Sequence, residues 1–127
     1  MEIRVYYQDT DAGGVVYYSN YLKYFESGRT EYLRDRGFLI GEMARRGFVF
    51  PVVHLEIDYR APALLDDLLR VETVVLEIKK SSFTLAQQVL RAIDGKLLAD
   101  GKVIMACVGP GMKPQRLPEE IIQAFKE

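Results

Sequence analysis

The sequence predicts an α+β domain in which a curved antiparallel β-sheet wraps around one long helix. Residues 18–37 carry a single apolar stripe at helical spacing. Four longer segments between residues 48 and 108 have strand-like apolar patterns and are joined by short turns. With 127 residues, the chain can bury a core without a disulfide or metal, so residues 1–127 are predicted to form a single domain.

A short strand and then the long helix are expected at the start of the chain. Ile3, Val5 and Tyr7 alternate with more polar neighbours, which is typical of a half-buried strand. The helix of residues 18–37 is predicted to end near Gly37, a residue suited to a left-handed C-terminal position. Gly28 lies within the apolar stripe, where it costs a helix about 1 kcal/mol relative to Ala. Close approach of another backbone, as in a helix lying across a sheet, would offset this cost.

The rest of the chain is mostly β-patterned. The expected strands cover residues 48–59, 68–79, 82–93 and 96–108. Asp94-Gly95, between the last two, is a strong signal for a tight hairpin. No element is assigned to residues 38–47, and residues 117–127 are expected to form a short helix with Pro near its start.

Two of the expected strands carry apolar residues on both faces. Phe83 and Leu85 lie on one face of residues 82–93, whereas Ala86 and Leu90 lie on the other. One helix can cover only one face of a sheet, so a second subunit is the natural cover for the other face. Scattered surface aliphatic residues on a twisted sheet are the alternative explanation.

Composition and charge indicate a protein of the cytoplasm. Lys and Arg total 17 against 18 Asp and Glu, without a basic block, which argues against a nucleic-acid partner or an anionic membrane. The single Cys107 lies in an apolar run and is expected to be a reduced, buried thiol. No apolar run approaches the roughly 18 residues that an integral membrane segment needs.

The stretch DTDAGGVVYYSNY, from Asp9 to Tyr21, combines two acids, two glycines and the expected start of the helix. A helix N-terminus can hydrogen-bond a carbonyl oxygen that develops negative charge, while a nearby carboxylate attacks the carbonyl carbon or deprotonates water. The glycines would let a ligand approach the backbone closely. Asp is also a common turn former and cap, and spacing alone favours that simpler reading.

The residues themselves resemble a known family. YYQDTDAGGVVYYSNYLKYFESGRTEYLR, residues 6–34, resembles the signature of the 4-hydroxybenzoyl-CoA thioesterase family, and within it the acyl-CoA thioesterases of YbgC type. The likeness continues through VVHLEIDYRAPALLDDLL, KKSSFTLAQQVLR and CVGPGMKPQRLPEEI, nearly the whole chain. It implies the hotdog fold, acyl-CoA thioester hydrolysis without a cofactor or metal, and coenzyme A as part of the substrate.

The resemblance also implies roles for particular residues. Asp11 corresponds to the family's catalytic carboxylate, acting as nucleophile or as base for water. Tyr18 would open the helix and polarise the thioester oxygen through its backbone N–H. Members of YbgC type often carry His at this position, so the Tyr18 side chain departs from the family pattern. Asp9 is expected to be structural.

Further expected contacts surround the substrate. Gly13, Gly14 and Val15 would lie against the thioester, and Tyr59 and Pro62 would line the acyl channel, although apolar packing explains the last two equally well. The segment Lys79, Lys80, Ser81 and Ser82 would contact the phosphates and nucleotide of coenzyme A, with a solvated strand end as the alternative. Family members form homodimers through sheet edges, often paired into a homotetramer, with active sites at the subunit interface.

Other functions use the same fold. A dehydratase or isomerase would typically need a catalytic His, but the only histidine, His54, lies on the polar face of an expected strand. An acyl carrier protein thioesterase would act on the same thioester presented by a protein. A non-catalytic acyl-binding or envelope-associated interaction protein could keep the groove without activity.

Overall fold

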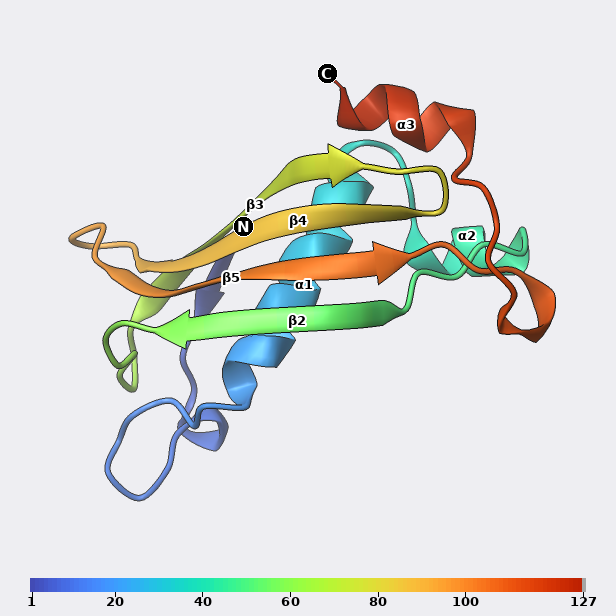
Figure 1. Ribbon diagram of the computed structural model, residues 1–127. Coiled ribbons are helices and arrows are strands. Elements are labelled where there is room, and N and C mark those ends of the chain that lie inside the picture. Colours follow the sequence, from blue (N-terminus) through green and yellow to red (C-terminus); the bar gives the residue numbers. More distant parts are fainter. Residues whose placement is uncertain (127) are drawn as a thin grey trace.

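A computed structural model describes residues 1–126 and shows one antiparallel sheet with a long helix lying across it (Figure 1). The strand order is β1-β3-β4-β5-β2, so β1 and β2 form the two edges. The helix α1 (Asn20–Asp35) lies behind the sheet in this view. The strands are β1 (Glu2–Arg4), β2 (Val52–Tyr59), β3 (Leu68–Ile78), β4 (Ser82–Arg91) and β5 (Leu97–Ala106). This arrangement confirms the predicted α+β class and the hotdog fold.

The register of the sheet determines which residues share one end. Val52 pairs with Met105, and Ser82 pairs with Ala106, so these residues lie at the same end. Tyr59 pairs with Ala99 at the opposite end. The predicted hairpin between β4 and β5 is present, with Gly95 at φ 70° and its N–H bonded to the carbonyl of Arg91 at 2.8 Å.

The buried face of α1 packs on the concave face of the sheet. Tyr21, Phe25 and Leu33 are buried, as their helical spacing predicted. Gly37, at φ 91°, follows the helix in the left-handed conformation expected from the sequence. Gly28 makes a close approach, but to side chains and not to a backbone as predicted: a Cβ added there would lie 2.6 Å from Cγ1 of Val71.

A buried polar group joins α1 to the sheet. Gln87 of β4 is only 1% exposed, and its Nε2 donates to the Phe25 carbonyl at 2.8 Å and to Oγ1 of Thr73 at 3.0 Å. Its Oε1 accepts a hydrogen bond from Nη1 of Arg29 at 3.1 Å. These bonds offset the cost of burying the Gln87 amide and fix the position of the helix over the sheet.

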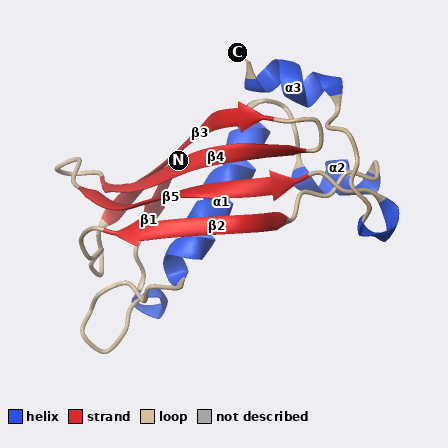
Figure 2. Cartoon of the chain, in the orientation of Figure 1, coloured by secondary structure: helices blue, strands red, loops and turns tan. Residues whose placement is uncertain are grey.

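Within residues 1–126, four shorter helical segments accompany α1 and the sheet (Figure 2). The predicted C-terminal helix is α3 (Glu119–Phe125), with Ile121 and Phe125 buried. The helix α2 (Ile40–Arg45) was not predicted, because its six residues are too few to show a helical stripe and bury only Met43. The 3-10 helices are η1 (Tyr7–Asp9) and η2 (Pro110–Met112), and η1 begins where the first strand was expected to continue.

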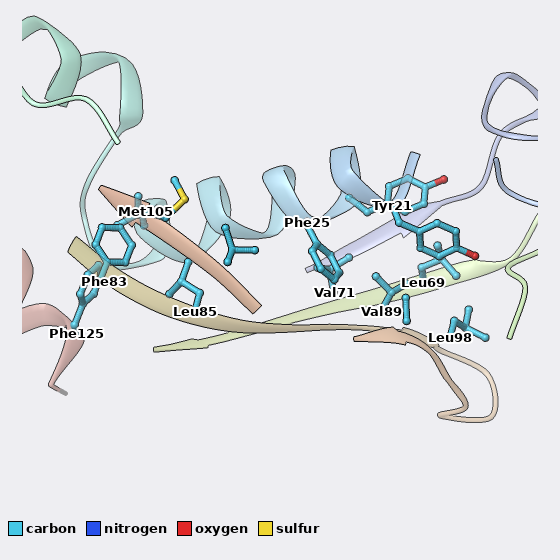
Figure 3. Packing of buried hydrophobic residues seen from close by; sticks show 14 of the residues in the cluster. Tyr21, Phe25, Leu69, Val71, Phe83, Leu85, Val89, Leu98, Met105 and Phe125 are labelled. Atoms are coloured by element: carbon cyan, nitrogen blue, oxygen red, sulfur yellow. The ribbon is translucent and has the colours of Figure 1, made fainter. Parts of the chain in front are cut away.

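The hydrophobic core extends along α1 from one end of the sheet to the other (Figure 3). Phe83, Met105 and Phe125 gather near the C-terminal half of the helix, whereas Tyr21 and Leu98 lie near its N-terminal half. Between residues 1 and 126, no helix combines the length and apolar character needed to cross a bilayer.

Candidate active site

Residues 9–17 form a tight hairpin at the N-terminal end of α1, drawn as a projecting loop in Figures 1 and 2. At its base, the Tyr17 N–H donates to the Asp9 carbonyl at 3.0 Å, and Thr10 pairs with Val16. At its tip, the Gly14 N–H donates to the Asp11 carbonyl at 3.1 Å. Gly14 has φ 80°, a conformation that favours glycine, so this residue permits the turn.

The turn itself orients the carboxylate of Asp11. Oδ1 accepts the Gly13 N–H at 2.8 Å, and a Cβ added at Gly13 would lie 3.3 Å from this oxygen. Asp11 is exposed, and Oδ2 makes no hydrogen bond or ion pair with any residue between 1 and 126. One oxygen is therefore held by the backbone while the other is free to react.

The second arm of the hairpin lies against the segment that follows β2. The Val16 N–H donates to the Ala63 carbonyl at 2.9 Å, and the Leu65 N–H donates to the Gly14 carbonyl at 3.1 Å. Val15 pairs with Leu64 in an isolated bridge. Gly14 and Val15 thus connect the Asp11 turn to the rest of the domain.

Asp9 has the structural contacts that the sequence predicted for it. Oδ2 accepts the Tyr6 N–H at 2.9 Å, and Oδ1 accepts Nδ2 of Asn20 at 3.0 Å. The same Asn20 amide lies 3.2 Å from the Asp9 carbonyl. Because Asn20 is the first residue of α1, these bonds attach the base of the hairpin to the helix.

Tyr18 lies just before the helix and does not open it as predicted, since α1 begins at Asn20. Its carbonyl accepts the hydroxyl of Tyr59 at 3.1 Å and the Tyr21 N–H at 3.4 Å. Its own N–H has no acceptor in the part of the chain that the structure describes. A free N–H beside a helix N-terminus is suited to bind an oxygen that becomes negative.

A cleft of about 340 Å³ is lined in part by Tyr18. It brings together three residues that the sequence predicted for the site, Tyr18, Tyr59 and Pro62. The other lining residues are Val16, Tyr21, Arg60 and Ala61. Apart from Arg60, the side chains that line the cleft are aromatic or apolar, which is typical of a pocket for a small organic group.

Tyr21 contributes to this cleft but was predicted only as part of the apolar stripe. Its hydroxyl accepts the Ala63 N–H at 3.1 Å, and its ring meets Tyr59 edge to face at 5.3 Å between centroids. Burial raises the pKa of both tyrosines, so both remain protonated at neutral pH. The helical spacing placed Tyr21 on the buried face, but no local pattern indicated that its hydroxyl reaches residue 63.

The predicted coenzyme A contacts lie at the other end of the sheet in the same chain. Lys79 and Lys80 are exposed at the turn between β3 and β4. The Ser81 carbonyl accepts the Cys107 N–H at 2.8 Å, and the Ser82 carbonyl accepts the Lys79 N–H at 2.8 Å. From Ser82 to the Tyr59 end is a distance of seven strand positions, or roughly 23 Å. Within one chain, the segment of residues 79–82 is therefore far from Asp11.

His54 lies on the polar face of β2, where its Nε2 is 3.6 Å from a carboxylate oxygen of Glu56. Among the residues that the structure describes, no three His, Cys, Asp or Glu side chains are grouped as metal ligands.

Comparison with known proteins defines the class of this protein. The chain belongs to the thioesterase-like superfamily, whose model matches residues 5–125. It is 39% identical over 126 residues to the acyl-CoA thioester hydrolase YbgC of Escherichia coli O6:H1, covering 98% of this chain and 93% of that protein. It is 46% identical over 125 residues to the acyl-CoA thioesterase YbgC of Haemophilus influenzae, covering 97% and 90%. The predicted family resemblance is confirmed.

Solved structures agree with this assignment. A 1,4-dihydroxy-2-naphthoyl-CoA thioesterase from Synechocystis superposes with a TM-score of 0.93 at 27% identity, covering 100% of this chain and 94% of that one. A probable thioesterase from Bartonella henselae gives a TM-score of 0.88 at 38% identity, covering 93% and 97%.

Proposed function

We propose that this protein is an acyl-CoA thioesterase that hydrolyses the thioester to a free carboxylic acid and coenzyme A. The observation that carries the proposal is the presence of two free groups in the segment that leads into the N-terminal end of α1. These are the Oδ2 atom of Asp11 and the backbone N–H of Tyr18. Relatives that align over nearly the full chain are named acyl-CoA thioesterases, which supports the same substrate class here.

In the proposed reaction, the thioester carbonyl oxygen accepts the Tyr18 N–H while Asp11 supplies the base or the nucleophile. As base, Asp11 takes a proton from a water that attacks the carbonyl carbon. As nucleophile, its oxygen attacks the carbon, and water then hydrolyses the anhydride that forms. In both routes the C–S bond breaks, and coenzyme A leaves as a thiolate that takes a proton. A thiolate is a good leaving group, so the chemistry requires no cofactor or metal.

The Tyr18 side chain is compatible with this mechanism. It is 61% exposed and packs at a tilt against the Tyr17 ring, with ring centroids 4.6 Å apart. The proposed oxyanion donor is a backbone group, which Tyr supplies as well as His does. The loss of an imidazole therefore affects assistance in proton transfer and leaves the oxyanion contact in place.

The proposed active site is completed by a second copy of the chain. Among residues 1–126, the edge strand β2 pairs with β5 alone, and Val52 and Val53 are 43% and 61% exposed. Antiparallel pairing of two β2 strands about a two-fold axis would place the Tyr59 end of one chain beside the Val52 end of the other. Since Ser82 shares the Val52 end, the Lys79–Ser82 turn of the second copy would then lie on the side of the Asp11 hairpin.

We propose that the outer face of the sheet, opposite α1, mediates assembly beyond the dimer. Ala86 and Ile104 lie on the face opposite α1 and are half-buried, and Val74 is 55% exposed. Packing two such faces together would give a homotetramer.

We further propose that the protein acts in the cytoplasm and has no nucleic-acid partner, as its charge balance suggests.

A kinetic screen of the purified protein tests the proposed function. Short, long and aromatic acyl-CoA thioesters would be compared with the same acyl groups on acyl carrier protein. We expect hydrolysis of at least one acyl-CoA and a loss of about a hundredfold or more in Asp11→Asn. Turnover by Asp11→Asn at the wild-type rate would refute the role of Asp11. Faster turnover of the carrier-protein substrates would favour that alternative, and no turnover of any thioester would favour a binding protein.

A mixing experiment tests the shared site. Asp11→Asn and a Lys79→Ala, Lys80→Ala double variant would each have low activity. If each site uses Asp11 of one chain and the lysines of another, a mixed dimer regains one intact site. Activity that does not recover in mixed dimers would contradict the proposed arrangement.

A further inference from the structure

The edge strand β2 carries two potential metal ligands on its outer face. His54 and Glu56 are exposed, whereas Leu55 and Ile57 on the other face pack against the hydrophobic core. Nε2 of His54 lies 3.6 Å from Oε1 of Glu56. An imidazole nitrogen and a carboxylate oxygen are both ligands that Zn²⁺ binds in proteins. One chain thus supplies half of a four-ligand site.

The proposed thioesterase mechanism leaves this pair without a role. His54 is the only histidine of the chain, and its side chain is 56% exposed, against 63% for Glu56. Lys102 lies opposite Glu56 on β5, but within residues 1–126 the two side chains make no ion pair. The imidazole and the carboxylate are therefore both accessible to a ligand on the outer face.

The proposed pairing of two β2 strands determines what faces this pair. Side chains directly opposite each other on neighbouring antiparallel strands share one face, so outer-face residues of one β2 lie opposite outer-face residues of the other. A two-fold axis through Leu55 places His54 opposite the partner's Glu56, and Glu56 opposite the partner's His54. It pairs residues 52–58, nearly the whole of β2 (Val52–Tyr59).

Charge favours this register over the neighbouring ones. An axis through Glu56 would place the two Glu56 carboxylates opposite each other, and an axis through Ile57 would place Glu56 opposite the partner's Asp58. Like charges directly opposite destabilise a strand pair, whereas an imidazole opposite a carboxylate can donate a hydrogen bond to it. An axis through His54 would pair a shorter part of the strand. The edge itself therefore favours the register about Leu55.

We propose that two paired β2 strands bind one Zn²⁺ at their two-fold axis, through His54 and Glu56 of both copies. Opposite residues have Cβ atoms about 5 Å apart, and alternate residues of one strand are roughly 6.6 Å apart. The four side chains thus surround one point on the outer face, where each can reach an ion at about 2 Å. Two carboxylates balance the charge of Zn²⁺, and four protein ligands leave no open position, as in structural zinc sites.

The zinc site requires the proposed β2 pairing but not the proposed hydrolysis. Tyr59, which lines the thioester cleft, shares the face of Leu55 and lies five strand positions from His54, or roughly 17 Å away. The zinc would lie on the opposite face of the sheet, where it joins the two copies and takes no part in the reaction. The four ligands are complete in the dimer, so the site needs no contact between dimers.

Zinc titration of the untagged protein tests the site. The chain has one histidine and one cysteine, and Cys107 is buried, so His54 supplies the only imidazole and no exposed thiol competes. Calorimetry should give one Zn²⁺ per two chains, and NMR should show a saturable shift of the His54 ring signals. One ion per chain, or unchanged His54 signals, would overturn the proposal.

Three exposed positions of β2 test the ligand set. His54→Gln and Glu56→Gln should each weaken zinc binding by about a hundredfold or more, because even the outer partners of metal ligands contribute about ten- to a hundredfold. Asp58→Asn, a carboxylate on the same face of the same strand, is the matched control and should bind zinc with unchanged affinity. Thermal unfolding checks that the variants are folded. Unchanged affinity in His54→Gln would refute the site, and loss of binding in Asp58→Asn alone would refute the register about Leu55.

Asp11→Asn separates the zinc site from the proposed enzymatic function. Asp11 lies outside the β2 pair, so this variant should bind zinc with wild-type affinity and stoichiometry. A protein that binds one Zn²⁺ per two chains but hydrolyses no thioester would support the site and refute only the enzymatic function. Hydrolysis by a dimer that binds no zinc would refute only the zinc site.

Discussion

The hydroxyl of Tyr59, the last residue of β2, donates a hydrogen bond to the carbonyl of Tyr18 at 3.1 Å. This bond joins the edge strand of the sheet to the turn that leads into α1. By holding the Tyr18 carbonyl, this bond restrains the backbone around Tyr18. The backbone N–H of the same residue is the free group proposed to bind the thioester oxygen. Tyr59 is thus a positioning residue as well as part of the cleft wall.

Tyr59→Phe is expected to lower kcat by about threefold to tenfold, which corresponds to the loss of one neutral hydrogen bond. KM should change less, because the aromatic ring that lines the cleft is retained. Steady-state kinetics with one acyl-CoA measures both parameters, and Tyr6→Phe, an exposed residue outside the cleft, is the matched control. An unchanged kcat in Tyr59→Phe would show that the bond has no role in positioning.

The two acids of the hairpin should respond differently to substitution. Asp9→Ala removes the acceptor for Tyr6 and Asn20 and should lower the free energy of unfolding by about 1–3 kcal/mol. Asp11→Asn retains an Oδ1 acceptor for the Gly13 N–H and should leave stability nearly unchanged while abolishing activity. Urea unfolding of both variants checks this contrast. Equal stability losses would mean that Asp11 is also structural.

Two helical glycines provide a matched pair for helix packing. A Cβ in Gly28→Ala would displace Val71 and disturb the bonds of Gln87, so we expect a destabilisation of about 2 kcal/mol. In Gly41→Ala the nearest atom to the Cβ is Nη1 of Arg45 at 3.8 Å, and the variant should be stabilised by about 0.5–1 kcal/mol. Denaturant midpoints compare the two. A stabilised Gly28→Ala would show that α1 can move away from the sheet.

The buried hydroxyl of Tyr24 leads us to expect a loss of stability at alkaline pH. Burial raises its pKa, with the nearby Asp9 carboxylate adding to the effect, yet its buried hydroxyl has no hydrogen-bond partner among residues 1–126. The folded state therefore keeps the proton above pH 10, where the unfolded state releases it, and stability falls as the pH rises. The contribution of the protonated Tyr24 to the free energy of unfolding is fully present below about pH 10.

Tyr24→Phe should reduce this alkaline loss. At neutral pH it should be neutral or stabilising by about 1 kcal/mol, because it removes an unpaired buried hydroxyl. Thermal unfolding at pH 7 and pH 10.5 provides the comparison. A large destabilisation at pH 7 would indicate that the hydroxyl is bonded in solution, for example through water.

Much of the fold could be predicted because its signals are local. The helical spacing of Tyr21, Phe25 and Leu33 identified α1, and Asp94-Gly95 identified the last hairpin. The short helix α2 has too few residues for a periodic signal. The Asp11 turn was found through its acids and glycines and through family resemblance, whereas spacing alone did not separate a catalytic acid from a capping one.

The sequence by itself determined the long helix, the main strands, the acidic turn and the family, because each depends on neighbouring residues or on a motif read along the chain. Only the tertiary structure decided that Tyr18 and Tyr59 meet and that the Lys79 turn lies at the opposite end from Asp11. These relationships depend on strand register and on the position of α1 over the sheet. Periodicity identifies which face of an element is buried, but it carries no information about which distant residue lies across from it.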